Sequence, residues 1–122
     1  MDLIDAYSKI QNTDSDPKAI ILYAANAFES FLQQIANSHK ISLVGKNGIA
    51  QKSDALSSVI SKKHRGMIQY ICQIRNAVEH GADPDEGGKV WNISNESALM
   101  YPIIVASIIK SIVLRENGIL SI

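Results

Sequence analysis

The chain has 122 residues, of which 46% are hydrophobic and 20% charged; these proportions exclude a disordered protein and favour one compact domain spanning residues 1–122. Basic and acidic side chains number 12 each, so the net charge of zero does not by itself indicate nucleic-acid binding. The single cysteine, Cys72, excludes an internal disulfide framework and a zinc site made of several cysteines.

The N-terminus is acidic and lacks the apolar core of a secretory signal, as the sequence Met1-Asp2-Leu3-Ile4-Asp5 shows. We therefore expect a cytoplasmic protein. A short helical stripe is predicted next, ended by the polar run 12–15, and its apolar residues are Leu3, Ile4, Tyr7 and Ile10.

The clearest predicted helix begins at Asp16-Pro17, because aspartate is a favourable N-cap and proline is tolerated at the first helical position. Its apolar residues recur at helical spacing and predict a buried face: Ile20, Ala24, Ala27, Phe28, Phe31, Leu32 and Ile35. Uncharged polar residues recur on the other side, which suits either a polar interface or simple exposure: Asn26, Ser30, Gln33 and Asn37.

Loop signals at Gly45 and Asn47-Gly48 separate this helix from a short one predicted over about residues 53–61. The short helix is expected to turn Leu56, Val59 and Ile60 inward. The basic segment Lys62-Lys63-His64-Arg65-Gly66 is expected to interrupt the helical pattern.

A further helix is predicted over about residues 67–80, and Gly81 is expected to end it as a left-handed cap. Its inward residues are Met67, Ile71, Ile74 and Val78.

A polar loop over residues 82–91 leads to the last predicted helix, at about residues 94–117, with Ser94 as its N-cap and a kink expected at Pro102. The stretch 98–114 is apolar on nearly all sides, which indicates a central place in a bundle or contact with a second subunit. We expect it to be too short and too interrupted to span a membrane. The chain is therefore predicted to be all-α, with four or five helices.

Basic residues concentrate in the middle of the chain. Residues 40–75 carry seven basic side chains and one acidic side chain, Asp54, a local excess of six positive charges. Within this segment Lys62, Lys63 and Arg65 are our candidate contacts to RNA phosphates, because a basic patch binds polyanions through counterion release. The alternative is a solvated lysine face.

Polar residues gather at the end of the predicted helix 67–80. With Met67 at zero on a helical wheel, Arg75 lies at about 80° and Glu79 at about 120°, which predicts an i,i+4 pair. Asn76 and His80, at about 180° and 220°, predict a second pair on the same side.

These residue types suit RNA cleavage without a metal. A base must take the proton from the 2′-hydroxyl that attacks the phosphorus, and histidine titrates near neutrality. A cation must stabilise the charge that builds on the phosphoryl oxygens, and arginine offers a planar fork of donors. No carboxylate-rich metal cluster is visible in the sequence, so we expect no metal and no cofactor. A histidine that only stabilises the end of a helix is the alternative.

The segment Arg75-Asn76-Ala77-Val78-Glu79-His80 resembles the signature of the HEPN superfamily, the "higher eukaryotes and prokaryotes nucleotide-binding" domains. That signature is an arginine, a polar residue directly after it, and a histidine a few residues further on. The layout of a small helical bundle, with the motif late on a core helix and a final apolar helix, is also similar from about residue 17 to 118. The sequences "AANAFESFLQQIA" and "RNAVEHG" resemble the abortive-infection branch of the superfamily.

The resemblance implies a metal-independent endoribonuclease of a toxin–antitoxin or phage-defence system, in which two copies place their motifs in one cleft. It assigns catalysis to Arg75 and His80, with Asn76 orienting or supporting them. RNA, a second copy of the chain, and an antitoxin or larger defence protein are the implied partners. The alternative is a non-catalytic HEPN-like module that binds RNA or nucleotides or serves dimerisation.

Four further residues are candidates for a functional role. Glu29 is expected either to pair with Arg75 across the bundle or to be solvated, and with Glu79 it is a candidate supporting residue. His64 is either an RNA contact or, preferably, an exposed loop residue. Cys72 is expected to be a small buried apolar residue rather than a nucleophile. Trp91 is either a base-stacking platform or a residue that packs the loop onto the bundle.

Overall fold

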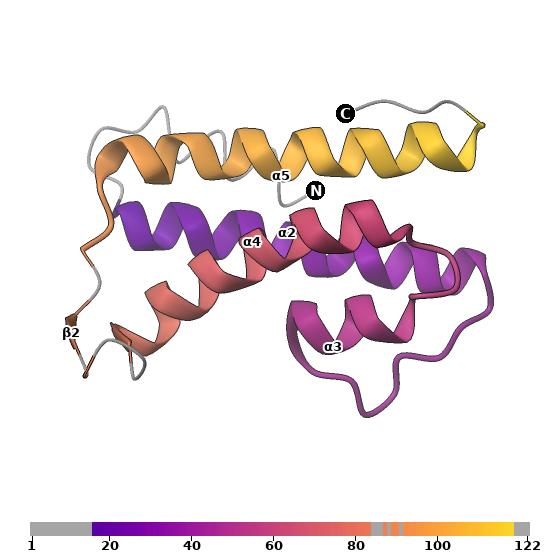
Figure 1. The fold of residues 1–122 in the computed structure, drawn as a ribbon, viewed down its shortest axis with the longest axis horizontal. Coiled ribbons are helices and arrows are strands. Elements are labelled where there is room, and N and C mark those ends of the chain that lie inside the picture. The colour runs from indigo at the N-terminus through magenta and orange to yellow at the C-terminus, as the bar shows by residue number, and fades with distance from the viewer. Residues whose placement is uncertain (1–15, 84–86, 88, 91, 119–122) are drawn as a thin grey trace.

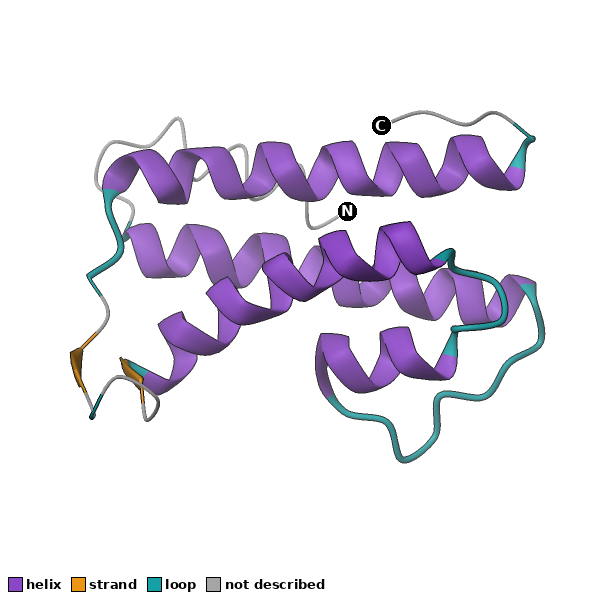
Figure 2. Ribbon diagram, in the orientation of Figure 1, coloured by secondary structure: helices purple, strands orange, loops and turns teal. Residues whose placement is uncertain are grey.

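The computed structural model describes residues 16–83, 87, 89–90 and 92–118, and in these residues the chain is an all-α bundle (Figures 1 and 2). The predicted fold class is confirmed. The predicted stripe in residues 3–10, and Trp91, lie outside the described residues. The helices are α2 (Pro17–Ser38), α3 (Gly48–Ala55), α4 (Lys62–His80) and α5 (Asn95–Glu116). An antiparallel hairpin lies between α4 and α5 along the chain, and each of its strands, β1 (Ala82–Asp83) and β2 (Lys89–Val90), has two residues.

Helix α2 is the centre of the bundle, since it contacts each of the other three helices. It begins as predicted: Pro17 is its first residue, and the carboxylate of Asp16 accepts a hydrogen bond of 3.0 Å from the backbone N–H of Lys18. Ile21, Phe28 and Leu32 are fully buried on its inner face. The periodicity of apolar residues therefore located the core correctly.

Helix α5 also follows its predicted bounds. The hydroxyl of Ser94 caps it, accepting a hydrogen bond of 3.1 Å from the N–H of Ser97. The helix continues through Pro102, which is buried, so the proline does not end it. Apolar side chains remain exposed on its outer side: Leu99, Met100, Ile103 and Val113.

By length and composition alone, α5 is long and apolar enough to cross a bilayer, with a mean hydropathy of 1.9 over 18 residues. The expectation that this stretch is too short for a span is therefore wrong on length. Core helices of bundles share this composition, and here one face of α5 is buried against the other helices: Ala98, Tyr101, Val105, Ile108 and Ile112.

The boundary between α3 and α4 differs from the prediction. Helix α3 ends at Ala55 rather than near residue 61, although Leu56 and Ile60 are buried as expected. Helix α4 begins at Lys62, so the basic segment forms its first turn instead of interrupting the helical pattern. The hydroxyl of Ser61 caps this turn by accepting a hydrogen bond of 3.2 Å from the N–H of His64. The sequence hides this start, because the turn carries cations where acidic residues are usual.

His64 is not the exposed loop residue that was expected. Its side chain is buried, with 5% of the residue exposed, and it connects two helices. Nε2 lies 2.7 Å from the hydroxyl of Ser111 on α5, and Nδ1 lies 2.9 Å from that of Ser61. Burial lowers the pKa of His64 below its usual 6.5, and the charges of Arg115 and Lys63 lower it further.

The lowered pKa of His64 predicts that the stability of the fold depends on pH. The unfolded chain protonates this imidazole near pH 6.5, whereas the folded chain resists protonation. The stabilisation is therefore complete above about pH 6.5 and is lost progressively as the pH falls below it. We expect the urea midpoint to fall between pH 7.5 and 5, and to fall less in a His64→Gln variant. Circular dichroism at each pH controls for helix content, and equal pH dependence in both proteins would contradict the prediction.

Candidate functional site

The last turns of α4 carry the predicted catalytic residues and end where the sequence indicated. Gly81 adopts a left-handed conformation, with φ of 71°, and its N–H donates to the carbonyl of Ala77 over 3.0 Å. This conformation strains any residue with a side chain, which explains the glycine directly after the motif. Ala77 and Val78 are buried, so the motif stays on the helix while its polar side chains face outward.

The guanidinium group of Arg75 is held close to the helix. It forms the predicted ion pair with Glu79, and Nη1 makes a long contact of 3.5 Å with the side-chain oxygen of Asn76. The Arg75 side chain is only 23% exposed, and its Nε is buried without a hydrogen-bond partner in the described part of the chain. An unsatisfied buried donor costs roughly 1–3 kcal/mol, so this arginine occupies a costly position.

Asn76 and His80 are both exposed on α4. The amide nitrogen of Asn76 donates to the sulfur of Cys72 over 3.6 Å, rather than to the imidazole of His80. Among the described residues, the side chain of His80 has no hydrogen bond or ion pair, so the predicted pair of Asn76 with His80 is one of position only. Its imidazole is left accessible to a ligand.

A buried hydroxyl fixes the helix beneath these residues. Tyr101 of α5 is 1% exposed and donates a hydrogen bond of 2.8 Å to the carbonyl of Ile71, one turn before Arg75. Burial raises the pKa of the Tyr101 hydroxyl far above its usual value, so it stays a donor across the physiological range.

The structure places Glu29 and Cys72 differently from their predictions. Glu29 pairs with Lys52 of α3 at 3.1 Å rather than with Arg75. Cys72 is only partly buried, and it lies beside the motif as an acceptor for Asn76. Glu29 is thus neither paired with Arg75 nor solvated, since only 19% of its side chain is exposed, and its pairing with a residue of another helix is a relation that no sequence spacing reveals.

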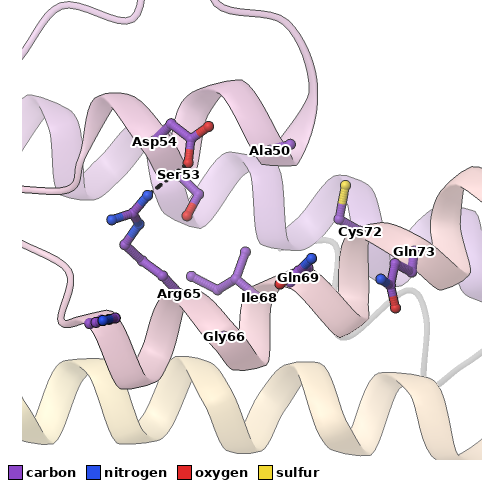
Figure 3. A pocket seen from close by; sticks show the side chains of 10 residues that line it. Ala50, Ser53, Asp54, Arg65, Gly66, Ile68, Gln69, Cys72 and Gln73 are labelled. Carbon is purple, nitrogen blue, oxygen red and sulfur yellow. Dashed lines mark hydrogen bonds and ion pairs between the residues drawn. The ribbon is translucent and has the colours of Figure 1, made fainter.

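The candidate RNA contacts of the basic segment differ in whether they form an ion pair. Lys62 and Lys63 are exposed and form no ion pair with any described residue, while Arg65 reaches from α4 to Asp54 of α3 at 3.0 Å. This pair is visible in Figure 3. It is partly exposed and contributes about 0–1 kcal/mol at most.

A cavity of about 600 Å³ lies between α3 and α4, and we call it the α3–α4 trough (Figure 3). Sequence reasoning missed it because it placed the start of α4 too late. On the helical wheel Gln69 and Gln73 lie at about 200° and 240°, on the same side as Asn76 and His80, and the earlier start of α4 adds Lys62 to that side at about 220°. Its lining residues are Ala50, Ser53, Asp54, Lys62, Arg65, Gly66, Ile68, Gln69, Cys72 and Gln73.

A second cavity, of about 450 Å³, lies between α4 and α5 and is almost wholly apolar. We call it the apolar groove. Tyr70 is 47% exposed there and Met100 51%, so large apolar surface faces solvent. Its lining residues are Met67, Tyr70, Met100, Ile103, Ile104, Ser107 and Ile108.

Within the described residues, no three histidine, cysteine, aspartate or glutamate side chains gather where they could hold a metal ion. Comparison of the chain with known protein families, with curated proteins and with solved structures finds no match. The interpretation of the site therefore rests on the chain's own residues and their geometry.

The hydrogen bond from Tyr101 predicts a local contribution to stability. Tyr101→Phe removes the donor but leaves the carbonyl of Ile71 to its helical partner, so we expect a loss of about 0.5–1.5 kcal/mol in the free energy of unfolding. Tyr70→Phe is the matched control, because the Tyr70 side chain is half exposed and should change stability little. Equal urea midpoints for Tyr101→Phe and the wild type would contradict this role of the hydroxyl.

Proposed function

We propose that the chain binds RNA and cleaves it without a metal, through Arg75 and His80 in an HEPN-like site. The observation that carries the proposal is the contrast between these two side chains on one helix end. Arg75 is held beside the helix with a buried donor unsatisfied, while His80 projects into solvent without a partner among the described residues. A fixed cation and an accessible imidazole at the same end of one helix suit transfer at a phosphate.

In the proposed reaction the imidazole of His80 accepts the proton of an RNA 2′-hydroxyl. The freed oxygen bonds to the adjacent phosphorus, and the bond from phosphorus to the 5′-oxygen breaks. The products are a 2′,3′-cyclic phosphate and a 5′-hydroxyl, whose proton comes from an imidazolium. In a dimer, His80 of the second copy fits this role of acid.

Arg75 acts in this scheme through Nη2, the terminal nitrogen that Glu79 does not contact. Glu79 and Asn76 both contact Nη1, whereas Nη2 makes no hydrogen bond with a described residue. A phosphoryl oxygen can accept from Nη2 while Glu79 and Asn76 hold the guanidinium in place. Glu79 and Asn76 are therefore proposed as positioning residues rather than catalytic ones.

One observation favours the alternative, a non-catalytic module that binds RNA or nucleotides or serves dimerisation. The carboxylate of Glu79 neutralises the charge of Arg75, and 46% of its side chain is exposed. A site that only binds RNA tolerates this arrangement better than a site that must stabilise extra negative charge in the transition state.

We also propose a cytoplasmic setting in a defence or toxin–antitoxin system, in which an antitoxin or a larger defence protein is the partner. This context rests on the resemblance of the motif alone.

The catalytic assignment predicts the behaviour of two variants. Arg75→Ala and His80→Ala should each lower the cleavage rate of a single-stranded RNA by ~10²–10⁴-fold, with helicity unchanged. Wild-type products should end in a 2′,3′-cyclic phosphate, and a chelator should not slow the reaction. His39→Ala is the matched histidine control. His39 pairs with Glu116 at the end of α5 and is not part of the proposed site, so this variant should keep full activity. Intact RNA after incubation with the wild type would favour the binding module, and cleavage that needs a divalent ion would place the chemistry elsewhere.

The proposed dimer is supported by the exposed apolar side chains of α5 and by the apolar groove beside them. Leu99, Met100 and Ile103 are exposed together with Tyr70 of α4. A helix that is apolar both inside and outside the bundle fits a two-fold interface, in which each groove covers the other copy's α5. In that arrangement the two copies of α4 flank the interface.

The dimer is tested by placing a charge in the groove. Ile103→Glu should halve the mass measured by light scattering while keeping the fold, since the Ile103 side chain is already 45% exposed in one chain. Val44→Glu is the control, because Val44 is the most exposed large apolar residue of the described chain and lies outside the groove. A wild type that is monomeric at high concentration would contradict the proposed interface.

A further inference from the structure

We infer that the α3–α4 trough and the face of α4 that continues from it form a track for single-stranded RNA, leading from Lys62 and Arg65 to His80. This inference rests on the proposed function and names the form of RNA that the site takes and the direction from which it is reached. Throughout, we call this surface the α4 track.

The geometry of the helix places the two ends of the track in line. Lys62 is the first residue of α4 and His80 the last, and the interval between them corresponds to five full turns. The two side chains therefore point to the same side, about 27 Å apart along the axis. Gln69, Gln73 and Asn76 lie between them, each within about 40° of that line.

The trough and the motif are continuous. Helix α3 lies beside the first half of α4 only, and the second half of α4 runs away from it toward the hairpin (Figure 1). Helix α3 thus forms one wall of the trough beside the first half of α4, and the lining reaches Cys72 and Gln73, directly before the motif. Cys72 joins the two regions, because it lines the trough and its sulfur accepts the hydrogen bond of Asn76.

The lining of the trough suits unpaired nucleotides. Ala50 is exposed in the trough and Gly66 leaves open space where a side chain would stand, which gives room for the face of a base, while Ile68 lines the trough but is almost fully buried. The amides of Gln69 and Gln73 each offer donors and acceptors, which match the exposed edge of an unpaired base. In a duplex those edges are already paired, and a volume of about 600 Å³ fits a small ligand rather than a duplex.

Cationic groups stand at one end of the trough. Lys62 and Arg65 both line it, whereas Lys63 does not, and the helical step turns Lys63 about 100° away from Lys62 toward the side of His64 and α5. Lys62 and Lys63 are thus adjacent exposed cations of which only one lies on the track. Asp54 is the acidic residue of the lining, and its carboxylate forms an ion pair with the guanidinium of Arg65.

The test measures binding of the full chain to a fluorescent single-stranded oligonucleotide of 2′-O-methyl RNA, by anisotropy over a range of salt concentrations. This probe has no free 2′-hydroxyl and cannot be cleaved, so the readout is independent of catalysis. Lys62→Gln should weaken binding and lower the salt slope by about 0.7, the value for one phosphate contact on a single strand. Lys63→Gln should change both much less, and Lys46→Gln, in the loop before α3, is the charge control.

Two further variants separate contact from bulk charge. Gln69→Ala together with Gln73→Ala should weaken binding about 2- to 10-fold per lost hydrogen bond without changing the salt slope. Asp54→Asn should tighten binding, because it removes the negative charge from the trough and frees Arg65. An RNA duplex of the same sequence should bind more weakly than the single strand.

The inference is overturned if Lys62→Gln and Lys63→Gln weaken binding equally, if Asp54→Asn weakens it, or if the duplex binds as well as the single strand. Cleavage that persists at the wild-type rate in Lys62→Gln and in the glutamine variants would also overturn the track, while leaving Arg75 and His80 in their proposed roles. Failure of the proposed function looks different: track variants then alter binding, but the wild type leaves free RNA intact.

Discussion

The position of α4 depends on two buried hydrogen-bonded contacts with α5, and the rest of the site depends on α4. Near its start, the imidazole of His64 contacts the hydroxyl of Ser111, and at its middle the hydroxyl of Tyr101 bonds the carbonyl of Ile71. Polar contacts in an apolar core are directional, whereas apolar packing alone permits a helix to rotate or slide. These two contacts therefore fix the rotation of α4, and with it the direction in which the polar face points.

That constraint explains how one helix carries both core and site residues. Ile68, Ile71 and Val78 are buried on one side, so the opposite side is available for polar groups along all five turns. Function in such a bundle resides in the side chains displayed on a rigid element rather than in the fold itself. The proposed chemistry and the proposed track use the same helix. A rotation or a shift of α4 would therefore disturb both.

Much of the fold could be predicted from the sequence, because its signals are local. The cap at Asp16, the glycine at Gly81 and the apolar periodicity of α2 depend only on neighbouring residues, and each was confirmed. The start of α4 was placed wrongly, because Ser61 caps a turn whose cations oppose the helix dipole. The i,i+4 pair of Arg75 and Glu79 was found for the same local reason, whereas the pairing of Glu29 and the burial of His64 depend on contacts between distant helices. Local patterns contain no information on such contacts.

The first turn of α4 is an electrostatically frustrated element. Lys62 and Lys63 stand at the positive end of a helix dipole, beside free backbone N–H groups, and within the described residues neither has an acidic partner. Asp54 partly compensates the charge of Arg65, and burial, followed by the charges of Arg115 and Lys63, lowers the pKa of His64, so that His64 adds no further positive charge at neutral pH. The folded chain therefore holds unrelieved like-charge repulsion at one defined corner. Added salt or any bound polyanion relieves this repulsion. The first turn of α4 therefore lowers the stability of the isolated chain, and binding of a negatively charged ligand there raises it.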